Sequence, residues 1–377
     1  MIKIHYFLDH PIQYQNPLLD KLSLSSKVNL KVIYLSDFSL KPYFDPGLNR
    51  TIKFDNIENF KHNHQFIFQN ENKSKIRFLF NFTKILIRDK PIFLWVHGYS
   101  NFYSIFSIII SFLLGIKVLL RGESNNFFKE NFLSRLKIFL FFKIIDPLIT
   151  SYLAIGKKNE EFYNRYTKKK IFKLPYVVGD LSRNKLIKKS DLNIFKRRYK
   201  INEKSFIIFY NAKIIERKNP ELLIKSFIQI RKACSKKITL IIAGDGDIKN
   251  RLIEKYKNFR EIKFVGFINQ NLLPKFYSIS DLFILPSNYD AWGLVVNEAM
   301  SFSIPIITSK NVISSYDLVK HNVNGVIFNN EFHLKQSMIN IINNKKIKKK
   351  FSKNSNIIIK NWNIETANKH FHKLIES

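Results

Sequence analysis

Two successive series of short apolar runs, separated by stretches with helical spacing, constrain the fold of this 377-residue chain most strongly. Alternation of such runs with helices is typical of a parallel sheet covered by helices on both faces. The first series comprises Ile2–Leu8, Leu30–Leu35, Ile92–Val96, Ile116–Leu120 and Tyr152–Ile155, and the second comprises Phe206–Tyr210, Thr239–Ala243, Lys263–Val265, Leu282–Leu285 and Pro305–Thr308. The sequence therefore predicts an α/β protein with two doubly wound, Rossmann-like lobes.

The predicted domain boundaries follow from these two series, because a chain of this length exceeds what one core usually supports. We expect an N-terminal lobe over 1–178 and a C-terminal lobe over 205–357. Residues 179–204 are rich in charge and turn residues and lack a long apolar run, so they are predicted to be a linker. The closing segment 358–377 is predicted to be a helix that packs back on the N-terminal lobe.

The charge of the chain leaves several partners open. It carries 63 Lys+Arg against 29 Asp+Glu, a formal net charge of +34, which attracts nucleic acid, anionic lipid or a polyanionic substrate. Compositional drift is an equal alternative, because Lys is scattered as well as clustered. Residues 132–145 mix apolar and basic side chains in a pattern suited to an anionic membrane surface, or to a helix between packed domains.

The cellular compartment is predicted from cysteine usage and apolar segments. Cys234 is the single cysteine and no leader-like segment opens the sequence, so we expect a cytoplasmic protein, peripheral at the inner face of a bacterial plasma membrane if the basic charge binds lipid. The uncharged span Gly98–Ile116 is nearly long enough to cross a bilayer. Four serines and an asparagine interrupt it and Gly115 ends it, which favours a buried or interfacial helix.

The most informative motif is LPSNYDAWGLVVNEAMSFSIPIIT, which places Asp290 and Glu298 eight residues apart at a transition from strand to helix. If the helix begins near Trp292–Gly293, Asp290 lies in the preceding loop and Glu298 projects from the second turn. Both carboxylates can then face one cleft. The alternative for either residue alone is a helix cap or a solvated helix position.

The same helix start also favours an anion. The N–H groups of Gly293, Leu294 and Val295 would point at the cleft, and oriented N–H groups together with the helix dipole attract phosphate. Gly293 would allow close approach of the ligand to the backbone. A diphosphate is therefore predicted at this position.

Two further segments of the C-terminal lobe favour a nucleotide. Lys213, Arg217 and Lys218 follow the run Phe206–Tyr210, where cations can neutralise a leaving diphosphate, although a solvated basic loop is the alternative. In LIIAGDGDIKNRLIE, Gly244 and Gly246 form a turn between strand and helix that suits close approach of a nucleotide. The D-x-D triplet within it is explained by that turn, so no metal is expected.

Together these segments resemble glycosyltransferase family 4, whose members are retaining enzymes with two Rossmann-like lobes in the GT-B fold. The family's E-x7-E pattern corresponds here to Asp290-x7-Glu298, with WGLVVNEAM, KFVGFINQNLLPKFYSISDLFILPS and AGDGD in matching surroundings. FLDHPIQYQNPLL, LWVHGYSN, LLRGESNNF and YLAIGKKNEEFYNRYTKKKIFKLPYVV resemble the more variable N-terminal lobe. The resemblance covers nearly the whole chain.

The resemblance implies a role for each candidate residue of the C-terminal lobe. Glu298 would hold the ribose hydroxyls, and Asp290, which is shorter than the family's Glu, would contact the donor sugar. Lys213 and Lys218 would contact the diphosphate. The remaining donor-binding candidates are Arg217, Gly244, Gly246, Phe267, Gly293, Leu294 and Val295.

The N-terminal lobe supplies candidates for the acceptor side. Glu123 occupies a loop position where many relatives carry a histidine that approaches the donor sugar, so it joins the catalytic candidates. Arg121 would recognise sugar hydroxyls or the acceptor, with a structural Arg–Glu pair as the alternative. His10 and Gln13 lie in the first strand-helix loop, where the acceptor commonly enters this fold, and His97 follows another strand.

The predicted function is retaining transfer of a hexose-type sugar from a UDP- or GDP-linked donor, without metal or other cofactor. The acceptor would be a growing glycan or a lipid-linked glycan in bacterial surface polysaccharide assembly, such as lipopolysaccharide O-antigen or capsule. Three alternatives remain: a GT-B nucleotide-sugar epimerase, a basic nucleic-acid-binding protein and a non-catalytic glycan- or membrane-binding module. The nucleic-acid alternative does not explain the Asp290–Glu298 pattern, so no nucleic-acid partner is expected.

Overall fold

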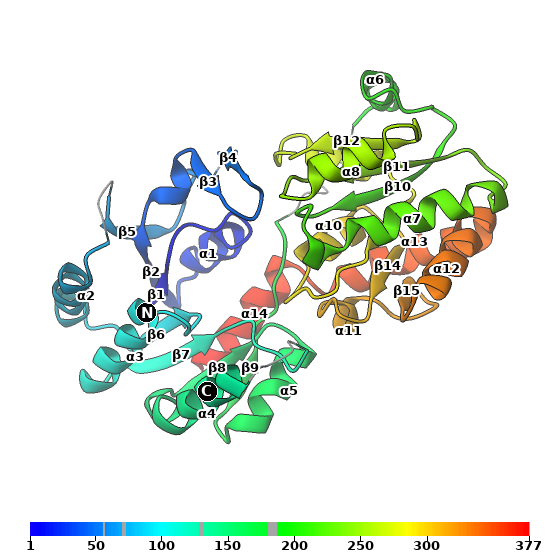
Figure 1. The fold of residues 1–377 in the computed structure, drawn as a ribbon. Coiled ribbons are helices and arrows are strands. Elements are labelled where there is room, and N and C mark those ends of the chain that lie inside the picture. The colour runs from blue at the N-terminus through cyan, green and yellow to red at the C-terminus, as the bar shows by residue number, and fades with distance from the viewer. Residues whose placement is uncertain (56, 70–72, 128–131, 180–186, 377) are drawn as a thin grey trace. The chain divides into compact units, whose positions relative to one another are not determined.

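The computed structural model describes residues 1–377 except 56, 70–72, 128–131, 180–186 and 377 (Figure 1). The chain forms two compact units. The first unit comprises Met1–Tyr43, Asn56–Gly179 and Ile364–Ser377, and the second comprises Phe44–Asp55 and Asp180–Asn363. Each unit contains one large parallel sheet with helices on both faces, as the two series of apolar runs predict.

The first unit is built on a seven-stranded parallel sheet in the order β5-β2-β1-β6-β7-β8-β9. Its strands are β1 (Ile2–Leu8), β2 (Val28–Ser36), β5 (Asn63–Phe68), β6 (Phe93–His97), β7 (Lys117–Arg121), β8 (Ser151–Ala154) and β9 (Ile171–Lys173). Residues of β1 alternate between two cores: Tyr6 packs on one face and Phe7 on the other. Burial on both faces explains why the strands are apolar runs. The edge strands β5 and β9 were not predicted, because they are short or partly polar.

The helices of the first unit are α1 (Asn16–Ser23), α2 (Lys75–Asp89), α3 (Phe102–Leu113), α4 (Phe132–Ile144), α5 (Lys157–Tyr166) and α14 (Ile364–Ile375). Helices α2 to α5 cover one face of the sheet, whereas α1 and α14 cover the other. The Asn101 side chain caps α3 by accepting a hydrogen bond from the Ser104 amide at 2.9 Å. No helix within the described part of the chain is both long and apolar enough to cross a bilayer.

The second unit contains a six-stranded parallel sheet in the order β12-β11-β10-β13-β14-β15. The strands are β10 (Phe206–Asn211), β11 (Ile238–Ala243), β12 (Ile262–Gly266), β13 (Leu282–Leu285), β14 (Ile306–Ser309) and β15 (Gly325–Phe328), the last of which was not predicted. The helices are α6 (Lys189–Arg198), α7 (Pro220–Ile230), α8 (Lys249–Tyr256), α9 (Leu273–Ile279), α10 (Leu294–Ser301), α11 (Ser315–Leu318), α12 (Glu331–Asn343) and α13 (Lys345–Ile359). Strand order reverses between β10 and β13, and sheets of this type bind ligands at the carboxyl ends beside such a reversal.

The boundaries of the units differ from the predicted ones at the hairpin, at the linker and at the closing segment, of which residues 358–363 group with the second unit. Residues Phe44–Asp55, with most of the hairpin of β3 (Tyr43–Asp45) and β4 (Arg50–Ile52), group with the second unit. Ion pairs of Asp45 with Lys213 and of Arg50 with Asp245 hold the hairpin on the second unit. The sequence does not show which residues a charged side chain of a short hairpin will contact. The predicted linker 179–204 contains α6, which packs on α9 through Phe195 and Phe276. Its residues 180–186 lie outside the described residues.

Candidate active site

The loop between β13 and α10 has the geometry that the Asp290–Glu298 motif predicts. Gly293 is the N-cap of α10 with φ of +88°, a conformation that favours glycine. A Cβ added there would lie 3.0 Å from Val312 Cγ1. Because glycine supplies no side-chain oxygen, the amides of Leu294 and Val295 in the first turn are available to an external anion.

Asp290 is fixed in this loop by backbone and side-chain contacts. Its N–H donates to Asn311 O at 3.0 Å and its carbonyl accepts from the Ile313 N–H at 3.1 Å. Its carboxylate forms an ion pair with Lys218, which ends the short 3-10 helix after β10. Asp290 is 8% exposed and Lys218 is 9% exposed. Burial lowers the pKa of Lys218, and the adjacent carboxylate opposes that shift.

Glu298 projects from the second turn of α10 into a small polar network. The Tyr277 hydroxyl donates to Glu298 Oε2 at 2.7 Å, and Asn211 Nδ2 donates to the Tyr277 hydroxyl at 3.2 Å. Burial raises the pKa of Glu298 to about 7, although the Tyr277 hydrogen bond acts in the opposite direction. A group that donates hydrogen bonds to this carboxylate would therefore stabilise its charged form near neutral pH.

Lys213 lies on the loop after β10 and is paired with the hairpin. Its Nζ lies 2.8 and 3.1 Å from the two carboxylate oxygens of Asp45. The Tyr210 hydroxyl donates to the Lys213 carbonyl at 2.9 Å, which fixes the loop backbone. Burial raises the pKa of Asp45, but the contact with Lys213 and the backbone hydrogen bonds from Gly47 and Leu48 together outweigh it, and the net shift is downward. Lys213 and Lys218 thus both carry a carboxylate counterion.

The hairpin also reaches the other donor-binding candidates. Arg50 forms an ion pair with Asp245 at 2.9 Å, and its guanidinium lies 5.8 Å from the centre of the Phe267 ring. Phe54 meets the same ring edge to face at 5.9 Å. Arg217, by contrast, is exposed and donates to Tyr289 O at 3.1 Å. It therefore braces the loop that carries Asp290.

The glycines of the AGDGD turn have a structural reason. A Cβ at Gly244 would lie 1.9 Å from Ala212 O, and one at Gly246 would lie 2.3 Å from Ile214 O. The φ angle of Gly244 is +124°. Both glycines thus allow the β11 turn to approach the backbone of the β10 loop. This packing is a structural reason for both glycines, and the predicted nucleotide contact stays a prediction.

In the first unit, Glu123 and His97 meet through Tyr176. The Tyr176 hydroxyl donates to Glu123 Oε1 at 2.7 Å and lies 3.4 Å from His97 Nε2. The Tyr6 hydroxyl lies 3.2 Å from His97 Nδ1. Burial, with a contribution from Arg121, lowers the pKa of His97 to about 3, so the ring is neutral at physiological pH.

The burial of Arg121 contradicts its predicted contact with an acceptor. Its side chain is 1% exposed, and Nη2 donates to the carbonyls of Leu174 and Pro175 at 3.0 and 3.3 Å. The guanidinium lies 4.4 Å from the centre of the Tyr176 ring. Arg121 therefore supports the residues that line this edge of the sheet. A basic residue at a strand end gives no sign in the sequence of whether it faces the solvent or the core.

His10 and Gln13 lie on the β1–α1 loop, as predicted. His10 Nδ1 lies 2.9 Å from Pro11 O, its ring lies 4.5 Å from the ring of Phe38, and burial lowers its pKa. Three residues of the second unit were missed: Tyr277, Asn211 and Asp45. Asn211 had a usable signal because it ends a central parallel strand. Tyr277 is brought to Glu298 only by tertiary packing, and Asp45 by the hairpin.

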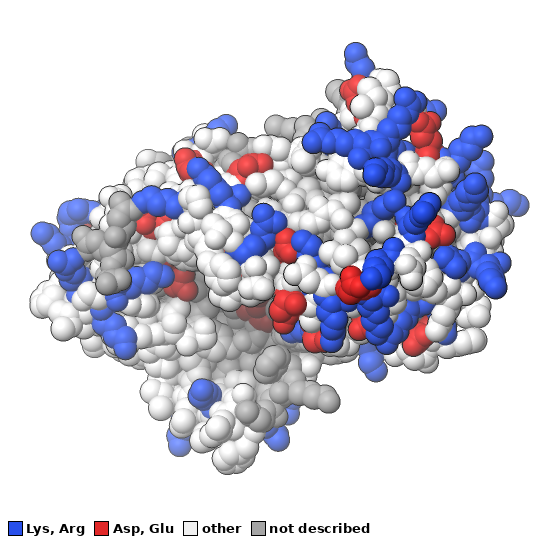
Figure 2. Space-filling model, turned by 45° about the horizontal axis from the view of Figure 1, so that its top comes forward, with Lys and Arg blue, Asp and Glu red and all other residues white. Residues whose placement is uncertain are grey.

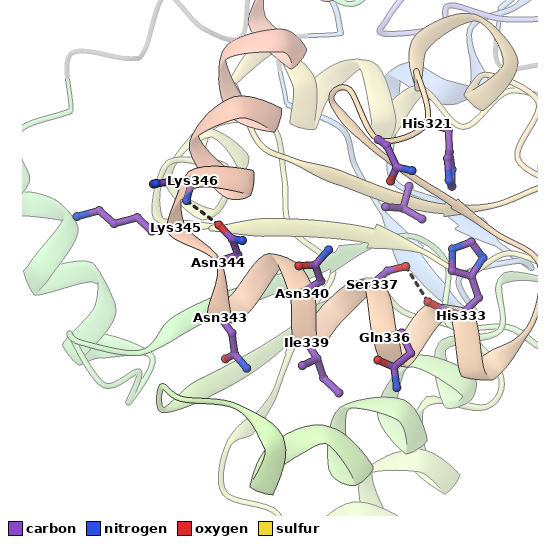
Figure 3. A pocket seen from close by; sticks show the side chains of 12 residues that line it. His321, His333, Gln336, Ser337, Ile339, Asn340, Asn343, Asn344, Lys345 and Lys346 are labelled. Carbon is purple, nitrogen blue, oxygen red and sulfur yellow. Dashed lines mark hydrogen bonds between the residues drawn. The ribbon is translucent and has the colours of Figure 1, made fainter.

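A large pocket of the second unit does not coincide with these residues. It has a volume of about 850 Å³ and is formed mainly by α12 and the start of α13, with His321 and His333 at one side (Figure 3). Its polar groups make structural hydrogen bonds: Ser337 Oγ donates to His333 O at 2.7 Å, and Asn344 Oδ1 accepts from the Lys346 amide at 3.0 Å. The motif residues, not this pocket, define the candidate site.

A comparison with known protein families covers the region that contains this site. Residues 191–357 match the model of the glycosyl transferases group 1 family. This part of the second unit is therefore similar to the glycosyl transferases of group 1. The matched region contains Lys213, Lys218, Asp290 and Glu298, so the motif residues lie in the part of the chain that is similar to this family.

Curated relatives resemble part of the chain. An uncharacterized glycosyltransferase of Methanocaldococcus jannaschii is 30% identical over 135 residues, covering 35% of this chain and 34% of the relative. The alpha-monoglucosyldiacylglycerol synthase of Acholeplasma laidlawii is 30% identical over 164 residues, covering 42% of this chain and 40% of the relative. The chain thus matches less than half the length of either relative.

Solved structures resemble the whole chain. Anabaena HepE in complex with UDP and glucose has a TM-score of 0.73 at 14% identity and covers 100% of both chains. WaaG, a glycosyltransferase involved in lipopolysaccharide biosynthesis, has a TM-score of 0.69 at 11% identity and covers 99% of both chains. These similarities confirm the GT-B fold, with two Rossmann-like α/β lobes.

Proposed function

We propose that the chain is a retaining hexosyltransferase that moves a sugar from a UDP- or GDP-linked donor to a growing glycan or a lipid-linked acceptor. Its context would be bacterial surface polysaccharide assembly, such as O-antigen or capsule. The observation that carries the proposal is the buried Lys218–Asp290 pair beside the N-terminus of α10, with Glu298 on the same helix. The GT-B neighbour that binds UDP and glucose supports a nucleotide-sugar donor.

Departure of the diphosphate is the reaction step that these residues are best placed to assist. As the bond between sugar and diphosphate breaks, negative charge grows on the diphosphate. Lys213, Lys218 and the first amides of α10 can stabilise that charge, and such stabilisation is usually the largest contribution to catalysis. The family resemblance implies that neither a metal nor a protein nucleophile is needed. The departing phosphate would then accept the proton of the acceptor hydroxyl.

Glu298 and Asp290 would position the donor. Two ribose hydroxyls can donate to the Glu298 carboxylate, which favours its charged form against the burial that raises its pKa. Asp290 can accept a hydrogen bond from the donor sugar with the carboxylate oxygen that does not face Lys218. The relative that makes a glucosyl lipid and the neighbour in lipopolysaccharide biosynthesis support a lipid-linked or surface-glycan acceptor. We place the enzyme in the cytoplasm, at the inner face of the plasma membrane.

A panel of UDP- and GDP-linked sugars tests the proposal. Binding is measured by calorimetry, and slow donor hydrolysis by release of the nucleotide. We expect at least one donor to bind and turn over, and Glu298→Ala to abolish both. Glu254→Gln, on the exposed side of α8, is the matched control and should behave like the wild type. Failure of all donors to bind, or donor turnover unaffected in Glu298→Ala, would overturn the assignment.

A further inference from the structure

Glu298 is partnered by a hydroxyl group, whereas many carboxylates of this chain are partnered by cations. On the visible surface, many Asp and Glu side chains lie against Lys or Arg (Figure 2). Glu216, for example, lies 2.6 Å from Arg251. Glu298 instead accepts from the Tyr277 hydroxyl at 2.7 Å and forms no ion pair with any residue that the structure describes. A hydroxyl donor orients a carboxylate without neutralising it, so the charge remains available to hydroxyl groups of a ligand.

The Tyr277 ring is held between other aromatic rings. It belongs to α9, and the side chain is 1% exposed. The ring stacks on Phe302, with the two ring centres 5.4 Å apart, and meets Phe209 of β10 edge to face at 5.2 Å. Offset-stacked and edge-to-face contacts are the arrangements that aromatic rings prefer. Because the ring is held from two sides, the position of its hydroxyl group is fixed.

Asn211 fixes the direction of the Tyr277 hydroxyl hydrogen. Asn211 Nδ2 donates to the Tyr277 oxygen at 3.2 Å, so the hydroxyl accepts from Asn211 and donates its own hydrogen to Glu298 Oε2. Asn211 ends β10, the strand at which the strand order reverses. Glu298 Oε1 has no hydrogen-bond donor among the described residues. One carboxylate oxygen is therefore anchored to the central strand through Tyr277, and the other remains for a ligand.

We propose that Tyr277 is a positioning residue for the donor: its hydroxyl, oriented by Asn211, holds the Glu298 carboxylate so that Oε1 accepts from the ribose hydroxyls of the nucleotide. Tyr277 acts through Glu298 and does not itself contact the ligand. The role deepens the proposed function and rests on it, because it requires that Glu298 binds ribose. The same hydrogen bond lowers the pKa of Glu298 against the effect of burial, and a charged carboxylate is the stronger acceptor.

Tyr277→Phe in the full chain tests this role, because it removes the hydroxyl and keeps the ring in its aromatic contacts. Calorimetry with UDP and with GDP measures nucleotide binding. At pH 7 we expect the dissociation constant to rise about tenfold, because the Glu298 carboxylate loses its donor and is less charged. The value of kcat at saturating donor should stay within about twofold, since ribose is bound in both the ground and transition states. The matched control Tyr256→Phe removes a hydroxyl that donates to Glu221 at 3.0 Å and should behave like the wild type.

The pH profile separates positioning from a structural role. Loss of the Tyr277 hydrogen bond raises the pKa of Glu298 further, so the loss of affinity should be larger at pH 7 than at pH 9, where the carboxylate is charged in both proteins. Asn211→Ala keeps Tyr277 and should weaken binding in the same direction, by about threefold.

Three outcomes would overturn the positioning role while the proposed function stands. They are nucleotide affinity within about twofold of the wild type in Tyr277→Phe, an equal loss of affinity at pH 7 and pH 9, and an unchanged affinity in Asn211→Ala. Thermal unfolding shows whether Tyr277→Phe folds, and Asn211→Ala decides the matter if it does not. A wild type that binds neither UDP nor GDP would instead overturn the proposed function, and the positioning role with it.

Discussion

At the carboxyl edge of the second sheet, Asp290 faces a cation, whereas at the same edge of the first sheet Glu123 faces a hydroxyl group. Lys218 pairs with Asp290 and Lys213 with Asp45. In the first unit, Glu123 accepts from Tyr176, and the Arg121 guanidinium is bonded to backbone carbonyls. In the second unit, Lys213 and Lys218 can therefore exchange a carboxylate partner for an anionic leaving group. In the first unit, the Tyr176 hydroxyl is an uncharged hydrogen-bonding group of the kind that suits sugar hydroxyls.

Removing a cation from the second edge is the strongest test of this difference. Lys218→Met should lower kcat/KM for the donor by about a thousandfold, because it removes charge stabilisation of the leaving diphosphate. It also leaves Asp290 buried without a partner, at a cost of about 3–5 kcal/mol in unfolding free energy. Donor turnover and thermal unfolding are the measurements. Lys225→Met, on the exposed side of α7, is the control.

A second variant separates catalysis from folding. Lys218→Met/Asp290→Asn removes both charges, so it should recover much of the lost stability while its activity stays low. Recovery of activity in this double variant, or donor turnover within tenfold of the wild type in Lys218→Met, would show that the pair is only structural.

Glu298→Gln should weaken binding of UDP or GDP by about a hundredfold, because charge-assisted hydrogen bonds from the ribose hydroxyls are lost. The effect should fall mainly on KM for the donor, since the ribose contact exists in both the ground and transition states. Glu254→Gln provides the comparison. An unchanged dissociation constant for the nucleotide would show that Glu298 does not bind the donor.

The pH dependence of nucleotide binding sharpens the same assignment. Burial raises the pKa of Glu298 to about 7, and bound ribose favours the charged carboxylate. The affinity should therefore rise about tenfold between pH 6 and 8 in the wild type and stay flat in Glu298→Gln. The unfolding free energy of the free enzyme depends on pH in the opposite direction. Because the folded state binds more protons than the unfolded state between about pH 4.5 and 7, unfolding free energy falls as the pH rises through that window.

The sequence predicted the second edge better than the first. A strand, a glycine and an apolar helix in direct succession specify the β13–α10 loop locally, so the predicted positions of Asp290 in the loop and Glu298 on the helix are confirmed. The Lys213–Asp45 and Tyr277–Glu298 contacts join segments far apart in the chain, and no local pattern encodes them. Arg121 was predicted to contact the acceptor because it lies beside Glu123 in LLRGESNNF, and nothing in that segment indicates that its side chain is buried.

Tyr176→Phe should affect the acceptor side and leave the donor side unchanged. Glu123 and His97 lose the hydroxyl between them, and we expect transfer to the acceptor to fall about tenfold, close to the cost of leaving a polar group without its partner. Nucleotide affinity should stay within about twofold of the wild type. Steady-state kinetics with each substrate varied gives both values, with Tyr166→Phe as the control. A weaker nucleotide affinity would show that Tyr176 also contributes to donor binding.

Asp45→Asn should give the smallest effect, and in the opposite direction. The Asp45 carboxylate holds Lys213 at 2.8 Å, so a diphosphate must compete with it for the same ammonium group. A partly exposed ion pair contributes about 1 kcal/mol at most, which corresponds to roughly a fivefold tighter dissociation constant for UDP or GDP once the carboxylate is neutral. Asp191→Asn on α6 is the control, and calorimetry measures both. Weaker nucleotide binding in Asp45→Asn would mean that Asp45 positions Lys213 for the donor and does not compete with it.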